Sequence, residues 1–201
     1  MVDRINNVTE VSFKCNNCGK CCRYRGDIVL YPMDIIRISN FLNISCKDFL
    51  DEYTMTFECP SILSQIVIKS KKDKLLTCVF LDEKNMKCKI YEARPIACSN
   101  FPFILLNENS YSVQMVPCVK DFNRGSKVID LLMQNPRFLS EKKQRKEIDE
   151  LISKVNKKYE DLELFKKIIF KILYLGYNSK KDIVLQVKIR VTLIKILFCI
   201  Y

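Results

Sequence analysis

The stretch Cys15-Asn-Asn-Cys18-Gly19-Lys20-Cys21-Cys22 decides the fold, because it places four thiols within eight residues. The chain contains no histidine, and charged and amide side chains occupy its first ten residues, where a secretory signal would have its apolar core. Clustered thiols in a chain of this kind are typical of metal ligands rather than of disulfides. Four further cysteines complete an array of eight: Cys78, Cys88, Cys98 and Cys118.

The spacing within this stretch fits two kinds of metal centre. Cys15 and Cys18, two residues apart, can grip one ion, and Gly19 lets the backbone amides turn toward the sulfurs, as in a zinc knuckle. Adding Cys21 gives three cysteines spaced by two residues, which also resembles the run that holds a 4Fe–4S cluster. The sequence therefore predicts zinc or iron as the cofactor, and the spacing leaves the choice open.

The adjacent pair Cys21-Cys22 limits how the thiols are shared. Neighbouring side chains on an extended backbone point to opposite sides, so we expect the pair to be divided between two sites, or one member not to be a ligand. Eight thiols suit two four-sulfur sites, each combining early and late cysteines, which would couple metal binding to folding. The alternatives are a disulfide set or simply buried cysteines. The three cysteines outside the array are predicted to be small core residues: Cys46, Cys59 and Cys199.

The segment between Cys88 and Cys98 contributes two further candidates, which we expect to support the metal site without binding the metal directly. The guanidinium of Arg94 can donate to backbone carbonyls or offset thiolate charge, and Pro95 gives a rigid bend before Cys98. Tyr91 can pack over the site and donate its hydroxyl to a nearby group. A surface arginine and a core tyrosine are the alternative interpretation.

Together, Cys15-x2-Cys-Gly-x-Cys-Cys22, Cys88-x2-Tyr91-x2-Arg94-Pro95-x2-Cys98 and Phe101-Pro102 resemble the YkgJ-type cysteine-cluster family. The resemblance covers roughly Phe13 to Cys118 and implies a zinc- or iron-chelating domain whose ligand positions match all eight array cysteines. A related module occurs in flagellin lysine methylases, so a protein-modifying, methyltransferase-related enzyme is the alternative function. The family commonly has an arginine after the Cys98-type cysteine, whereas this chain has Ser99 and Asn100.

Composition bounds the remaining function classes. The chain has 201 residues, 48% of them apolar, and a net charge of +11. Residues 1–122 carry 16 Lys and Arg against 14 Asp and Glu, and the remainder carries 18 against 9, so the basic character belongs to the C-terminal half. Acidic residues are interspersed there, which disfavours a nucleic-acid-binding module. Without histidine there is no Ser-His-Asp triad, and four glycines leave no phosphate-binding loop.

These observations predict an α+β protein with a cysteine-cluster domain over residues 1–124 and a basic, mainly helical extension over residues 125–201. No charge-free apolar stretch approaches the ~18 residues of a membrane helix, so we expect a cytoplasmic protein without a membrane partner. The sequence does not identify a partner: a protein partner or substrate is one candidate, and nucleic acid is disfavoured.

Local patterns predict the elements. We expect helices over residues 32–42, with Ile35, Ile38, Phe41 and Leu42 on one apolar face, and over residues 47–53, capped by Ser45 or Cys46. Strands are expected over residues 64–70 and 75–81, and a hairpin over 101–106 and 111–116. A long helix should begin at a Ser140 cap and end at Gly176. Residues 185–193 fit a strand by period or a helix packed on its neighbour.

Overall fold

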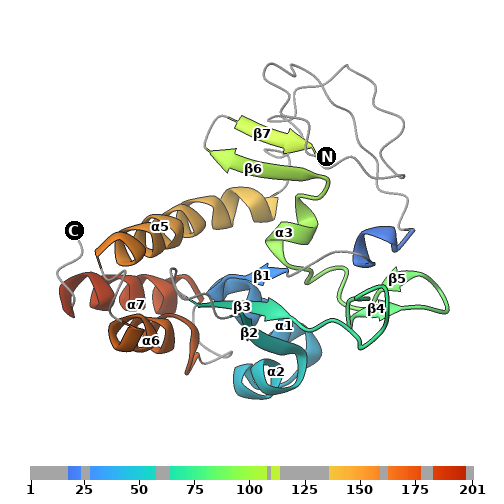
Figure 1. The fold of residues 1–201 in the computed structure, drawn as a ribbon, viewed down its shortest axis with the longest axis horizontal. Coiled ribbons are helices and arrows are strands. Elements are labelled where there is room, and N and C mark those ends of the chain that lie inside the picture. The colour runs from blue at the N-terminus through green and yellow to red at the C-terminus, as the bar shows by residue number, and fades with distance from the viewer. Residues whose placement is uncertain are drawn as a thin grey trace.

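The computed structural model describes residues 18–23, 28–57, 64–107, 110–113, 136–158, 163–177 and 183–197. The fold is mixed α+β with small antiparallel sheets and a helical C-terminal part, as expected (Figure 1). The helices are η1 (Lys20–Cys22), α1 (Pro32–Leu42), α2 (Cys46–Tyr53), α3 (Ile96–Ser99), α5 (Pro136–Lys158), α6 (Glu163–Tyr174) and α7 (Ile183–Leu197). The strands are β1 (Val29–Leu30), β2 (Thr54–Phe57), β3 (Gln65–Ile68), β4 (Leu81–Asp82), β5 (Lys87–Cys88), β6 (Phe103–Asn107) and β7 (Ser110–Val113).

Helix α1 confirms the bounds expected for residues 32–42. Pro32 opens it, and the carboxylate of Asp34 accepts a hydrogen bond from the Tyr31 amide at 3.0 Å, which completes a capping box. Of the residues expected on one apolar face, Ile35 and Ile38 are buried, whereas Phe41 is 49% exposed. The buried stripe is centred on Ile35 and Ser39, and Ile36 completes it on the side opposite Phe41.

Helix α2 confirms the second expected helix and begins one residue earlier, at Cys46. The hydroxyl of Ser45 accepts from the Asp48 amide at 3.0 Å, so Ser45 is the cap. Cys46 is only 4% exposed, which confirms it as a core residue. Cys59 and Cys199 lie outside the described residues.

Strand β3 lies within the expected strand over residues 64–70. It forms the centre of an antiparallel sheet of order β1-β3-β2. The expected strand over residues 75–81 is wrong apart from one bridge between Ser70 and Cys78 and the start of β4 at Leu81. The physical reason is the Asp73 carboxylate, which accepts from the amides of Leu75 and Thr77 and folds this segment into turns.

The hairpin expected around residues 107–110 is confirmed by the antiparallel pairing of β6 with β7. The sequence does not predict the second hairpin, β4–β5, whose strands have only two residues each. Such short strands leave almost no alternation for a sequence pattern to show.

The C-terminal part is helical, and the expected end at Gly176 is confirmed, because α6 ends at Tyr174 and Gly176 has a left-handed φ of +72°. The helix expected from a Ser140 cap instead begins at Pro136, a residue favoured in a first helical turn. The single expected helix is two, α5 and α6, and both pack against α7. Residues 185–193 belong to α7, in which Val187, Val191 and Ile194 are buried at helical spacing.

One hydrophobic core joins the N-terminal elements to these helices. It includes Ile35 of α1, Ile66 of β3, Ile96 of α3 and Val191 of α7. The Tyr31 hydroxyl donates to Asp149 of α5 at 2.6 Å across the same contact. Helices α5–α7 lie at one end of the molecule and the β4–β5 hairpin at the other (Figure 1). Among the helices described, none has the length and apolarity to cross a membrane.

Candidate metal centre

Helix η1 carries Cys21 and Cys22 against the β4–β5 hairpin. Its N-cap, Gly19, has a left-handed backbone with φ of +66°. A Cβ atom built at Gly19 would lie 2.6 Å from the carbonyl oxygen of Met86 and 3.0 Å from Leu81 Cδ1. Both the φ angle and this close approach require glycine, so Gly19 allows the early cysteines to lie on the hairpin.

Backbone hydrogen bonds bring the late cysteines to the same place. The Cys78 amide donates to the Cys22 carbonyl oxygen at 2.8 Å, and the Leu81 amide donates to the Cys78 carbonyl oxygen at 3.0 Å. Leu81 in turn pairs with Cys88 in the β4–β5 register. The backbone therefore links Cys22, Cys78 and Cys88 through one short set of contacts.

Neighbouring array cysteines change the pKa of the Cys22 and Cys88 thiols. The pKa of Cys22 is raised by a hydrogen bond with the Cys21 side chain, by burial, and by charge on Cys21, Cys78 and Cys88. Burial raises the pKa of Cys88, Cys21 raises it further, and the Arg94 guanidinium opposes the shift. Charge effects of this kind fall with distance, so the thiols of Cys21, Cys78 and Cys88 lie within electrostatic range of Cys22.

The contact between Cys21 and Cys22 corrects one premise of the sequence argument. An extended backbone predicts opposite orientations, whereas residues 20–22 form a turn of 3-10 helix. In this turn a hydrogen bond with the Cys21 side chain raises the pKa of Cys22. The extended-backbone argument for dividing the pair between two sites therefore does not apply.

Of the four other predicted ligands, the structure describes Cys18 and Cys98. Cys18 precedes Gly19, Cys98 lies on α3, and both are partly buried. Cys15 and Cys118 lie outside the described residues. None of the seven described cysteines forms a disulfide. Within the described ranges, no three Cys, Asp or Glu side chains have an arrangement that could hold a metal ion.

Arg94 and Tyr91 form a pair beside Cys88. The Arg94 guanidinium donates from Nη1 to the Tyr91 carbonyl oxygen at 2.6 Å and stacks 3.9 Å from the centre of the Tyr91 ring. The same guanidinium favours the ionised form of Cys88. The Arg94 guanidinium therefore donates to a backbone carbonyl oxygen and favours the thiolate form of Cys88, as its fixed charge and its several N–H donors allow.

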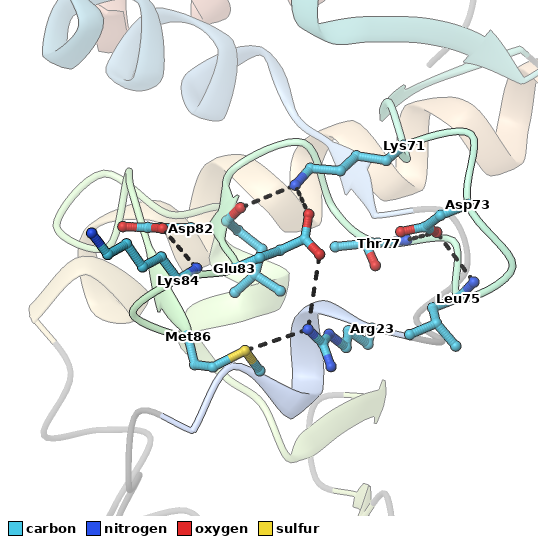
Figure 2. A network of polar contacts seen from close by, with 10 residues as sticks. Arg23, Lys71, Asp73, Leu75, Thr77, Asp82, Glu83, Lys84 and Met86 are labelled. Atoms are coloured by element: carbon cyan, nitrogen blue, oxygen red, sulfur yellow. Dashed lines mark hydrogen bonds and ion pairs between the residues drawn. The ribbon is translucent and has the colours of Figure 1, made fainter.

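A charged network fixes the other side of η1 (Figure 2). The Glu83 carboxylate pairs with Lys71 and, at 3.9 Å, with Arg23, the residue after Cys22. Arg23 also donates from Nη2 to the Met86 sulfur at 3.5 Å. These side chains join the end of η1 to the hairpin and to the loop that leads to Cys78.

Two unpartnered buried atoms belong to residues close to array cysteines in the sequence. They are Arg23 Nε and Asn100 Oδ1. Arg23 follows Cys22, and Asn100 is two residues after Cys98. Buried polar groups without a partner are costly, so these residues are suited to a group that is bound at the cysteines.

Sequence reasoning missed Asp34 and Arg37 as residues that support the site. Asp34 is fully buried, and its Oδ1 atom accepts from the Ile96 amide at 3.0 Å, two residues before Cys98. Arg37 pairs with Asp34 and donates to the Arg94 carbonyl oxygen at 3.2 Å. The available signal was an acidic and a basic residue three apart in an otherwise apolar helix.

Several thiols gathered between a short helix and a two-stranded hairpin define a cysteine-cluster domain. The chain belongs to the CxxCxxCC family, described as a "putative zinc- or iron-chelating domain", which matches residues 14–119. The chain is also 30% identical over 93 residues to an uncharacterized protein of Methanocaldococcus jannaschii. That match covers 46% of this chain and 46% of the relative, so it spans about half the length of each. No solved structure matches the chain.

Proposed function

We propose that this protein binds zinc or iron through the thiolates of its eight array cysteines. The backbone contacts that bring Cys22, Cys78 and Cys88 together are the observation that carries the proposal. Thiolates are soft ligands that select zinc and iron–sulfur centres over magnesium or calcium. The description of the family points to the same two metals.

An unpartnered donor supports a metal–sulfur centre. Coordinated thiolates carry negative charge and accept hydrogen bonds from the groups around them. Arg23 Nε–H is a buried donor of the required kind, and Arg23 directly follows the array cysteine Cys22. Zinc in closed four-thiolate sites is structural, whereas an iron–sulfur cluster would supply electron transfer.

We further propose how the thiols are shared. Cys21, Cys22, Cys78 and Cys88 supply the first site, since backbone contacts bring Cys22, Cys78 and Cys88 together and Cys21 lies on the same turn as Cys22. The second site takes the remaining four array cysteines: Cys15, Cys18, Cys98 and Cys118. On this proposal residues 1–124 hold the metals in a reducing, cytoplasmic setting, and residues 125–201 support them through the shared core. No observation on the described residues favours the methyltransferase-related or nucleic-acid alternatives.

Metal content and absorption of anaerobically purified protein test the proposal. We expect stoichiometric zinc in a colourless protein, or iron with sulfide and broad charge-transfer absorption. Cys22→Ser should lose the metal of the first site, whereas Cys46→Ser, at a buried cysteine outside the array, should retain it. Never-oxidised wild-type protein that holds neither metal, or full metal content in Cys22→Ser, would contradict the proposal.

A further inference from the structure

The Asp34 carboxylate joins α1 to the segment that leads into α3. Its side chain is fully buried and both of its oxygens are used. Oδ2 accepts from the Tyr31 amide at 3.0 Å, and Oδ1 accepts from the Ile96 amide at 3.0 Å. Buried charges persist where they are paired and hydrogen-bonded, and Arg37 supplies the pairing cation here.

Arg37 extends this contact along the same segment. Its Nε donates to the Ala93 carbonyl oxygen at 3.4 Å, and its Nη2 donates to the Arg94 carbonyl oxygen at 3.2 Å. Together with the Asp34–Ile96 bond, three backbone groups within residues 93–96 are held by two side chains of one helix. A rigid helix that fixes three backbone groups also fixes the direction in which the chain leaves them.

From residues 93–96 the chain passes directly into the turn that carries Cys98. The Cys98 amide donates to the Pro95 carbonyl oxygen at 2.9 Å, and α3 begins at Ile96. The Cys98 thiol is therefore separated from the Asp34 contact by a single short turn. Movement of Ile96 would move Cys98 with it.

We propose that Asp34, with Arg37, is a positioning residue for the metal ligand Cys98. This inference rests on the proposed function, because it takes Cys98 to be a ligand. Asparagine cannot replace the carboxylate, since its one oxygen would serve only some of the three donors and its NH2 would face another. Groups that orient a metal ligand typically change metal affinity by 10- to 100-fold when they are altered.

A double-mutant cycle between Asp34 and Cys98 tests the inference on the full-length chain. The anaerobic protein is titrated with Co²⁺, whose thiolate charge-transfer absorption reports bound sulfurs, and zinc affinity is measured against a chelator. Wild type, Asp34→Asn, Cys98→Ser and the double variant complete the cycle. The matched control is Asp51→Asn, which breaks an exposed ion pair with Lys47 on α2.

We expect Asp34→Asn to weaken metal binding about 10- to 100-fold and to lower the charge-transfer absorption. In the Cys98→Ser background the same substitution should change affinity no further, because the ligand it positions is already absent. Asp51→Asn should bind metal as wild type does. A purely structural role would weaken binding equally in both backgrounds, and that result would overturn the inference.

The remaining outcomes separate this inference from the proposed function. Wild-type protein that binds none of cobalt, zinc or iron would remove the proposed function itself. Normal binding by Asp34→Asn would overturn the inference alone, whereas normal binding by Cys98→Ser would overturn it and also remove Cys98 from the proposed ligands. If Asp34→Asn does not fold, Arg37→Lys serves as the milder variant. It keeps the charge beside Asp34 but loses the fork to Ala93 and Arg94, and its smaller loss of affinity should also vanish without Cys98.

Discussion

The amide of Cys78 donates to the carbonyl oxygen of Cys22 at 2.8 Å, so two predicted ligands from distant parts of the chain are joined through their backbones. This bond lies beside the contact of Gly19 with the β4–β5 hairpin. The early cysteines are thereby docked by main-chain contacts, and their thiols converge as a consequence. Substitutions that disturb this docking should affect metal binding without removing a thiol.

Gly19→Ala is expected to weaken metal binding while every cysteine is retained. The added methyl group would meet the Met86 carbonyl oxygen at 2.6 Å, and a left-handed φ costs about 1–2 kcal/mol for a residue with a Cβ. The control is Gly176→Ala, which has a similar φ of +72° but no contact closer than 3.7 Å. Both variants should lose thermal stability, and only Gly19→Ala should lose metal affinity. Equal metal affinity in the two variants would show that the close approach is unimportant.

Cys46 and Cys22 should respond differently to substitution by alanine. Cys46 lies in the core of α2, where burial raises its pKa, so its thiol should resist alkylation at neutral pH. Cys46→Ala should destabilise the fold by about 1 kcal/mol and leave metal content unchanged. Cys22→Ala should instead remove the metal of the first site. Metal analysis and chemical unfolding of both variants provide the measurement, and loss of metal from Cys46→Ala would count against the assignment.

Asp73 should contribute stability that is lost in acid. Hydrogen bonds from Thr77 and Leu75 hold the pKa of its carboxyl below the ordinary value of 3.8. Because the folded-state pKa is the lower one, the contribution is fully present above the unfolded value and is lost as pH falls through the folded value. Asp73→Ala should therefore be less stable near neutral pH and closer to wild type in strong acid. Urea unfolding across pH measures this, with the exposed Asp51→Ala as control, and a loss independent of pH would refute it.

The sequence predicted the helices and the hairpin that carry strong local signals. Pro32 and Asp34 define the start of α1, and the Ser45 cap defines the start of α2. The sequence of α7 does not decide between helix and strand, because apolar residues occupy both its buried face and exposed positions such as Leu185 and Ile189. Periodicity fails in such a segment, since hydrophobicity no longer reports burial.

Within the site, residue types could be predicted but their neighbours could not. The cysteine array and the bend at Pro95 follow from spacing and composition. The contacts of Asp34 with Ile96 and of Gly19 with Met86 depend on tertiary packing between segments far apart in the chain. The orientation of Cys21 and Cys22 was inferred from an extended backbone, and a single 3-10 turn was enough to change it.

The aromatic stack beside the hairpin gives the protein an internal optical reporter. Tyr53 lies 5.1 Å from Phe80, centre to centre, and Phe80 is two residues after Cys78. The chain contains no tryptophan, so its ultraviolet fluorescence comes from tyrosine. An iron–sulfur chromophore nearby would quench that emission by energy transfer, whereas colourless zinc would leave it bright.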